Sequence, residues 1–359
     1  MSKRLQALVI PVTAVILGLI CGAIIMLIFG YDPIAGYSAL IEGVIGENFY
    51  IGETIRQATP YILVGLSVAV AFKAGLFNIG AEGQMLMGWL GSIIIAVNFD
   101  GLTKWIHLPL AIITGMVFGA LWAFIPGILK ATLRVNEVIV TIMLNYTALY
   151  IFNYVVQNLL TDGLDKTQEI HASASLQSEL LQSLTDYSSL HWGILIALGF
   201  ALIIWLMLNK TTFGYEIEAV GFNENASQYA GMSVKKTIIF SMVIAGALAG
   251  LGGVMEGLGT YGTAYVLTSS PGIGFDGIAV ALLGGSSPIG IVFSAILFGA
   301  LKVGALNMPA VAGVPNELVN VIIALIIFFV ASSYIIRWAM AKFKKGRKQN
   351  DSHFSDNCF

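Results

Sequence analysis

The chain has little charge and little cysteine. Only 11% of its 359 residues are charged, whereas 57% are hydrophobic, and its mean hydropathy is +0.85. This composition excludes an ordinary soluble globular protein and indicates an integral membrane protein, whose main solvent is lipid. The two cysteines, Cys21 and Cys358, lie inside an apolar run and at the end of a polar tail. They predict neither a disulfide nor a metal site.

Motifs for catalysis and cofactor binding are also absent from the sequence. No Gly-Lys dipeptide occurs, which excludes the phosphate-binding pattern GxxxxGK[ST]. The four histidines have no paired ligand spacing of the HExxH kind. We therefore predict no enzyme activity, no cofactor, no metal and no nucleic-acid partner for this chain. The chain itself is not expected to hydrolyse ATP by the Walker route.

Apolar runs that are long enough to enter a bilayer recur along the chain. They predict an all-α integral membrane protein with about ten membrane-entering helices. The ten runs are Leu5–Phe29, Tyr61–Phe72, Ala81–Val97, Leu108–Leu129, Val138–Val156, Trp192–Leu208, Ile238–Leu258, Ile278–Leu283, Ile289–Leu301 and Leu318–Tyr334. Residues 1–336 form the expected transmembrane domain, and residues 337–359 form a basic and polar cytoplasmic tail that contacts anionic lipid headgroups.

The distribution of Lys and Arg predicts the orientation of the spans. If both termini are cytoplasmic, the loops on that side carry most of the basic residues, as the positive-inside rule requires, and Lys302 remains ambiguous. The cytoplasmic loops are then those near Gly75, Lys130–Arg134 and Lys210–Lys236, and the external loops are Tyr31–Thr59, Thr161–Leu190 and Gly259–Phe275.

Two glycine-rich polar breaks interrupt the apolar pattern. The first is Gly75–Gln84, with the sequence GLFNIGAEGQ, and the second is Asp276–Gly290, with the sequence DGIAVALLGGSSPIG. Irregular backbone survives at membrane depth only where protein or a water-filled cavity surrounds it. Each break is therefore expected to line a pathway. Their places in two halves of five spans each indicate an inverted internal repeat, which would bring the breaks face to face.

Charged residues near membrane depth are few, and each is costly there. For Lys73, Glu137 and Glu317 a position at a helix end is the favoured interpretation, whereas Glu82 and Asp276 belong to the breaks. The chain shows neither the several buried carboxylates of an ion-coupled carrier nor the basic rings of an anion channel. The polar residues near the breaks are mostly uncharged and suit a neutral hydroxylated solute. The predicted pathway residues are Phe77, Asn78, Glu82, Gln84, Asn145 and Asp276.

Small residues at GxxxG spacing predict close helix packing in the membrane. The 40 glycines include four such pairs, Gly18/Gly22, Gly115/Gly119, Gly246/Gly250 and Gly253/Gly257.

The loop 214–232, with the sequence GYEIEAVGFNENASQYAGM, predicts a short helix on the cytoplasmic side. Asn223 or Asn225 can cap this helix, and Gly231 can end it. Such a helix can rest in the lipid headgroups, or it can dock into a soluble partner.

Four stretches together resemble the permease subunits of bacterial ABC importers for nucleosides and simple sugars. They are GLFNIGAEGQMLMG, NEVIVTIMLNY, GYEIEAVGFNENASQYAGM and GFDGIAVALLGGSSPIG, and the resemblance runs from Met1 to about Tyr334. Ribose-type permeases tend to read GxxDLSVG where this chain has GLFNIGAEGQ, so the pattern is closer to the nucleoside branch. The alternatives that stay open are a simple-sugar permease, an ion-coupled secondary carrier and a passive channel.

The resemblance also implies partners and a plasma-membrane location. In this family a coupling helix fits a groove on the ATP-binding subunit. The matching positions here are Gly221, Asn223, Asn225, Ala226, Tyr229, Ala230 and Gly231. The implied partners are a second, related permease, an ATP-binding subunit with two nucleotide-binding halves and an extracellular solute-binding lipoprotein.

Overall fold

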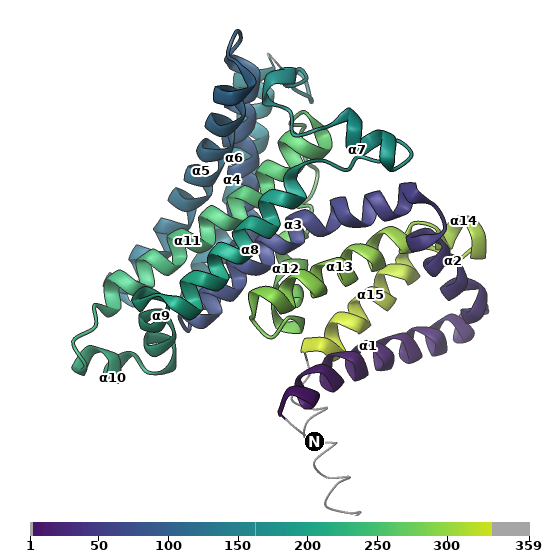
Figure 1. The fold of residues 1–359 in the computed structure, drawn as a ribbon, viewed down its shortest axis with the longest axis horizontal. Coiled ribbons are helices and arrows are strands. Elements are labelled where there is room, and N and C mark those ends of the chain that lie inside the picture. Colours follow the sequence, from purple (N-terminus) through teal and green to yellow (C-terminus); the bar gives the residue numbers. More distant parts are fainter. Residues whose placement is uncertain (1–2, 162, 332–359) are drawn as a thin grey trace, which may run out of the picture. The chain divides into compact units, whose positions relative to one another are not determined.

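The computed structural model describes residues 3–161 and 163–331, all of whose regular elements are helices (Figure 1). The predicted tail 337–359 and the last residues of the tenth apolar run lie outside this part. Six helical segments are long and apolar enough to cross a membrane. This agrees with an all-α membrane protein but confirms fewer spans than the ten expected.

The described residues fall into two compact units. The described part of the terminal unit consists of residues 3–41 and 305–331, and the central unit is Glu42–Gly304. The helices of the terminal unit are α1 (Lys3–Ile28), most of α2 (Pro33–Ile45), α14 (Met308–Ala312) and α15 (Asn316–Ala331).

The terminal unit is held together by close packing and by side-chain bonds to backbone carbonyls. Gly22 of α1 packs against Tyr37 of α2 and Ile322 of α15. The Tyr37 hydroxyl donates to the Leu19 carbonyl, and Asn307 Nδ2 donates to the Ala39 carbonyl at 3.1 Å. Both bonds give a partner to a polar side chain that would otherwise be unpaired in apolar surroundings.

The central unit consists mainly of long helices joined by short turns. Its helices are α3 (Asn48–Lys73), α4 (Ala81–Asn98), α5 (Lys104–Leu133), α6 (Glu137–Val155), the π-helix η1 (Val156–Leu160), the 3₁₀-helix η2 (Ala172–Ala174), α7 (Glu179–Leu184), α8 (Gly193–Lys210), α9 (Thr212–Phe222), α10 (Glu224–Tyr229), α11 (Val234–Val254), the π-helix η3 (Met255–Tyr261), α12 (Ile273–Leu283) and α13 (Pro288–Ala305).

The prediction of a loop at Tyr31–Thr59 is wrong, because α2 and the first half of α3 occupy most of this range. The hydropathy of the sequence did not predict the full length of α3, because the first half of this helix is polar. Within that half Glu53 and Arg56 form an ion pair at 2.6 Å, three residues apart on one helix face. Pro60 lies inside the same helix without ending it. In membrane helices, neighbouring groups compensate for the missing amide donor.

Helix α11 packs against α5, α4 and α3 through glycine contacts. A side chain at Gly250 would meet backbone of Gly115 and Gly119 on α5, and one at Gly253 would meet backbone of Met85 and Trp89 on α4. The GxxxG pairs on α5 and α11 are therefore confirmed as packing seams. Since no larger residue fits, these glycines set the distance between the helices.

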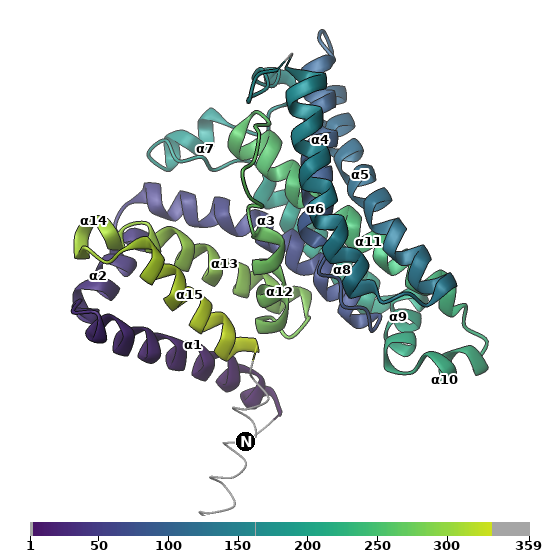
Figure 2. The ribbon, with the colours of Figure 1, turned by 180° about the vertical axis from the view of Figure 1, so that it is seen from behind.

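The connections of the central unit gather at two opposite ends of its long helices (Figure 1). Helices α9 and α10 lie at one end, which we name the α10 end, and α7 lies at the other, the α7 end. At the α7 end the segment before α8 bonds to η3 and to the segment after it, with Leu176 N donating to the Leu258 carbonyl of η3 at 3.0 Å and Thr167 N to the Ala264 carbonyl at 2.8 Å. Figure 2 shows the same separation from behind.

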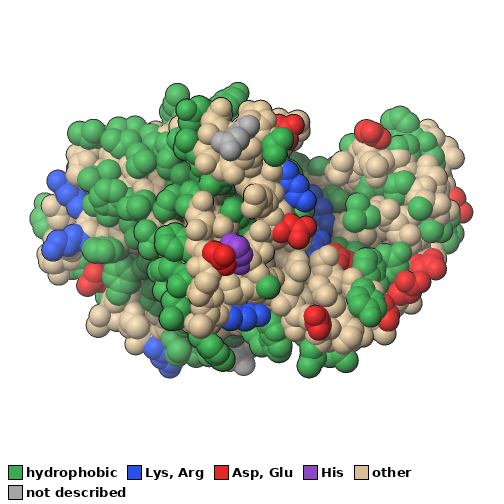
Figure 3. All heavy atoms as spheres, turned by 90° about the horizontal axis from the view of Figure 1, so that it is seen from above, with side chains coloured by type: hydrophobic (Ala, Val, Ile, Leu, Met, Phe, Trp, Pro, Cys, Tyr) green, Lys and Arg blue, Asp and Glu red, His purple; other side chains and the backbone are tan. Residues whose placement is uncertain are grey.

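The three loops expected to be cytoplasmic lie together at the α10 end (Figure 1), and the side of the membrane that they face stays a prediction. Figure 3 shows that charged side chains are sparse on the face seen from above, among wide areas of hydrophobic ones.

Candidate functional site

The first predicted break forms the turn between α3 and α4. Helix α3 ends at Lys73, Gly75 takes a positive φ of 74°, and α4 begins at Ala81. Only residues 75–80 of the predicted segment are therefore non-helical. The buried side chains of Asn78 and Gln84 hold the turn, because their amide groups bond each other twice, at 3.0 and 3.1 Å. Asn78 Oδ1 also accepts from Gly80 N at 3.0 Å.

Asn145 of α6 completes this turn from the neighbouring helix. Its Oδ1 accepts from Gly83 N at 2.8 Å, and its Nδ2 donates to the Ile79 carbonyl at 3.0 Å. The first turn of a helix has amide donors without intrahelical partners, which must be satisfied when they are buried. Asn145 supplies such a partner and joins α6 to the start of α4. Three of the predicted pathway residues thus share one hydrogen-bonded cluster.

Glu82 joins the first break to the segment that precedes α12. Its two carboxyl oxygens accept hydrogen bonds from the Ser270 hydroxyl, from Gly272 N at 2.8 Å and from Gly274 N. All three partners are donors, which suits an ionised carboxylate. The positive end of the α12 dipole adds a favourable interaction with this negative charge. Glu82 is fully buried, so it anchors the start of α12 from inside the protein.

The second break is a helical hairpin. Helix α12 runs toward the α10 end, a turn over residues 284–287 follows, and α13 runs back from that turn (Figure 1). Gly285 and Ser286 both take positive φ in this turn, and Pro288 begins α13. The first break is bonded to the segment that directly precedes the second break, through the hydrogen bonds of Glu82 to residues 270–274. Whether water lies between them stays a prediction.

Asp276 lies in the first turn of α12 and is only partly buried. Its Oδ2 accepts from the Tyr61 hydroxyl at 3.0 Å and forms an ion pair with Lys302 Nζ of α13, also at 3.0 Å. Sequence reasoning missed Tyr61 and left Lys302 unassigned. Phe77 lies apart from this group, with 41% of its surface exposed, and stacks on Phe72 at 5.3 Å between ring centroids.

The predicted short helix of the loop 214–232 is α10. Asn223 caps it, with its Oδ1 accepting from Ala226 N at 3.0 Å, which confirms one of the two capping candidates. Gly231 ends it, with a φ of 85°. Tyr229 is 95% exposed, so α10 presents an aromatic side chain that its own chain does not bury. Asn225 is exposed as well.

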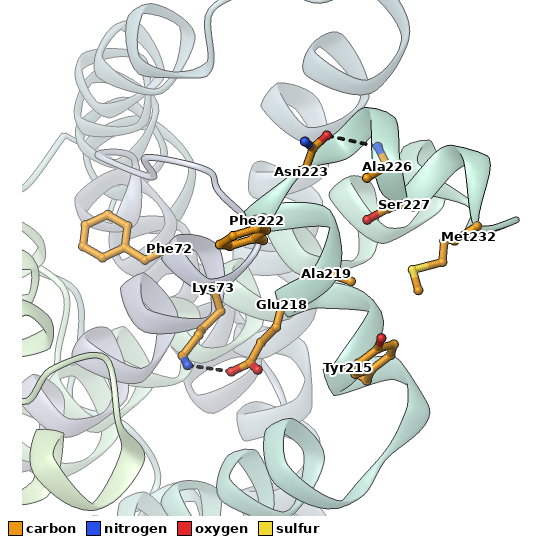
Figure 4. A pocket seen from close by; sticks show the side chains of 12 residues that line it. Phe72, Lys73, Tyr215, Glu218, Ala219, Phe222, Asn223, Ala226, Ser227 and Met232 are labelled. Atoms are coloured by element: carbon orange, nitrogen blue, oxygen red, sulfur yellow. Dashed lines mark hydrogen bonds and ion pairs between the residues drawn. The ribbon is translucent and has the colours of Figure 1, made fainter. Parts of the chain in front are cut away.

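A groove runs between α9, α10 and the end of α3 (Figure 4). Its lining includes Gly221, Asn223, Ala226 and Ala230, four of the seven predicted coupling positions.

At one wall of this groove Lys73 Nζ lies 2.6 Å from Glu218 Oε1. Gly221 packs directly on Gly75 and on the Lys73 carbonyl, and a side chain at Gly221 would collide with both. The loop 214–232 and the first break are thus in contact, which the sequence of neither segment indicated by itself.

Comparison with known proteins gives full-length relatives. The chain is 59% identical over 345 residues to the guanosine ABC transporter permease protein NupP of Bacillus subtilis strain 168, covering 96% of this chain and 99% of that protein. It is 47% identical over 350 residues to the nucleoside ABC transporter permease protein NupB of Lactococcus lactis subsp. cremoris strain MG1363, covering 96% of each.

A more distant relative comes from the same Bacillus strain. The chain is 25% identical over 280 residues to the guanosine ABC transporter permease protein NupQ, covering 75% of this chain and 86% of that protein. No solved structure matches the chain significantly. The model of the branched-chain amino acid transport system / permease component family matches residues 50–331. The chain therefore belongs to this family of membrane permease components.

Proposed function

We propose that the chain is the membrane-spanning permease subunit of an ATP-driven ABC importer that carries nucleosides across a bacterial plasma membrane. The observation that carries this proposal is the 59% identity to a guanosine ABC permease over almost the whole of both chains. The 47% identity to a second nucleoside ABC permease supports the same substrate class.

The importer is proposed to contain four kinds of component. NupP and NupQ, two permeases of one strain, support a second, related permease as the direct partner of this chain. The other two partners are an ATP-binding subunit with two nucleotide-binding halves and an extracellular solute-binding lipoprotein. The permease domain is 1–336, with a cytoplasmic tail at 337–359. Both termini and the α10 end face the cytoplasm, in accordance with the concentration of basic residues there.

The contacts of the central unit suggest how ATP binding moves the pathway. The ATP-binding subunit presses on α10, and α9 passes the displacement to the turn after α3, because Gly221 rests on Gly75 without a side chain between them. From that turn the hydrogen bonds of Glu82 lead to the start of α12. A displacement at the coupling helix therefore reaches the second break through the contact of Gly221 with Gly75 and the hydrogen bonds of Glu82.

The six predicted pathway residues shape the proposed pathway in two ways. Asn78, Glu82, Gln84 and Asn145 are buried and bonded to each other or to backbone, so they hold its wall in shape. Phe77 and Asp276 retain exposed surface and can touch the solute directly. Weak contacts suffice, since the external lipoprotein supplies most of the affinity.

The test is uptake by the complete complex in proteoliposomes. Labelled guanosine, the lipoprotein and internal ATP should give uptake that stops when a non-hydrolysable ATP analogue replaces ATP. An uncoupler should have no effect while ATP is held constant. Uptake that collapses with the uncoupler would indicate a secondary carrier, and flux independent of both would indicate a channel. Uptake of ribose in preference to guanosine would assign the chain to the sugar importers.

A further inference from the structure

An ion pair lies at the midpoint of helix α3 in the central unit. Tyr61 is close to the middle of the 26 residues of α3, which at about 1.5 Å per residue is roughly 39 Å long. Its hydroxyl donates to Asp276 Oδ2, and Lys302 Nζ lies 3.0 Å from the same oxygen. The Asp276–Lys302 pair is therefore about 20 Å from either end of α3, at membrane depth.

This pair is poorly explained as a stabilising element. Both charges lose hydration, and the attraction between buried partners only about compensates for that loss. Their side chains nevertheless remain partly exposed, 16% for Asp276 and 35% for Lys302. Ionisable residues at such depth usually mark a pathway for a solute or ion. The exposed fraction means that the pair has surface left for another molecule to contact.

Polar side chains of α3 continue from this pair toward the α7 end. Gln57 interacts with the Tyr61 hydroxyl and accepts from Arg56 Nη2 at 3.0 Å. Arg56 Nη1 reaches Thr260 Oγ1 of η3 at 3.5 Å. Positions 57 and 61 lie four residues apart on one side of the helix, and Arg56 is the neighbour of Gln57 in the chain. We name Arg56, Gln57, Tyr61, Asp276 and Lys302 the polar stripe.

On α3 the polar stripe ends at Tyr61. From Ile62 to Ala71 every residue of α3 is buried, and all but Ser67 are apolar or glycine. The stripe thus leads from the α7 end to mid-depth and no further.

An aromatic surface borders the polar stripe. Tyr261 follows Thr260, the partner of Arg56, and 46% of its surface is exposed. One face of its ring stacks on Trp89, with 5.3 Å between centroids and 11° between planes. The ring is therefore held rigidly, and its exposed surface is available for stacking with a flat ligand.

We propose that the polar stripe and Tyr261 line the outward-facing half of the solute pathway and contact the nucleoside there, the Asp276–Lys302 pair binding its ribose hydroxyls and Tyr261 stacking on its base. This proposal rests on the proposed nucleoside import. A carboxylate accepts hydrogen bonds from hydroxyl groups, whereas an ammonium group donates to them, so the pair matches two neighbouring hydroxyls. A flat base suits an aromatic face.

The first experiment asks whether water reaches the stripe. In a background with Cys21→Ser and Cys358→Ser, Gln57→Cys is exposed to a membrane-impermeant cationic methanethiosulfonate reagent added outside proteoliposomes. Thiols react as thiolates, which require water, so modification is expected, and guanosine with the lipoprotein should slow it. The control is Val117→Cys, near the middle of α5 with 46% of its surface exposed, which should stay unmodified in lipid.

Both variants are measured without nucleotide and during ATP turnover, because the pathway opens in only part of the cycle. If Gln57→Cys reacts as slowly as Val117→Cys in both conditions, the proposal is overturned. The parent complex must import guanosine in the same vesicles. Absence of that import would instead contradict the proposed function, so the two failures are distinguishable.

The second experiment removes both charges together, which avoids leaving one unpaired. The double variant Asp276→Asn with Lys302→Met should assemble with its partners and lose preference for ribose hydroxyls. The rate ratio of guanosine to 2′,3′-dideoxyguanosine should fall by about tenfold or more, as expected for lost hydrogen bonds to charged groups. The lipoprotein contributes equally to both complexes, so the change reports on the permease.

An unchanged ratio with full assembly would show a purely structural pair and refute the ribose contact. If the double variant does not assemble, Lys302→Arg, which retains the charge but moves the donors, replaces it with the same criterion.

Discussion

The anchoring of α12 by Glu82 can be tested by removing the carboxyl group. Glu82→Ala leaves the amides of Gly272 and Gly274 and the hydroxyl of Ser270 without their acceptor. The side chain is fully buried, so water does not readily replace it. Glu82→Gln keeps one acceptor oxygen but turns an amide NH₂ group toward a donor. The expected order of stability is therefore wild type, then Glu82→Gln, then Glu82→Ala.

The size of the effect follows from the donors that lose a partner. Each buried donor without an acceptor costs about 1–3 kcal/mol, so the two backbone amides alone predict a loss of about 2–6 kcal/mol in Glu82→Ala. The favourable interaction of the charge with the α12 dipole adds about 0.3–1 kcal/mol or more. The Gln variant should lose about half of the total.

The assay is thermal denaturation of the purified protein in detergent at one fixed heating rate, because membrane proteins commonly unfold irreversibly. The fraction that remains monodisperse is followed against temperature. Glu169→Ala, on an exposed loop, is the matched control and should behave as wild type. A Glu82→Ala protein as stable as this control would refute the anchoring role. If uptake nevertheless failed, Glu82 would act directly on the solute.

Three further changes probe other parts of the central unit. Gly253→Ala should lower stability by about 1–3 kcal/mol through overpacking against the backbone of Met85 and Trp89, whereas Gly199→Ala, which faces open space, should be neutral in the same thermal assay. Burial lowers the pKa of His191 from 6.5 to about 4, so its neutral form is favoured by the fold. The contribution of neutral His191 to the free energy of unfolding is complete above pH 6.5 and should be lost as the pH falls toward 4, by about 3 kcal/mol in all. The loss should appear as a falling denaturation temperature. Ala230→Trp, on the exposed side of the coupling region, should reduce substrate-stimulated ATPase activity of the complex without preventing assembly.

Each of the last two predictions has its own control. His191→Asn should flatten the pH profile. Leu180→Trp, on exposed α7 at the opposite end, should leave ATPase coupling intact. If Ala230→Trp couples as well as Leu180→Trp, the placement of the coupling helix is wrong. If His191→Asn keeps the full pH dependence, another group controls it.

Local signals in the sequence were sufficient for several features of this protein. Low charge and long apolar runs indicate membrane helices, because unsatisfied backbone groups cannot face lipid. Asn223 and Gly231 predict the limits of α10, since capping depends on neighbours within three or four residues. The glycine pairs on α5 and α11 predict close packing by their spacing alone. Each of these features is decided within one or two helical turns.

The tertiary structure decided which distant residues meet. Glu82 and Gly272 are 190 residues apart and Tyr61 and Asp276 are 215 apart, and no periodicity in one segment specifies a partner in another. For the same reason the full length of α3 stayed hidden, because its polar first half is compatible with the membrane only when η3 and the segment before α8 satisfy it. Sequence alone therefore determined the class of protein and its local elements. The folded chain determined which polar groups satisfy each other and which retain exposed surface.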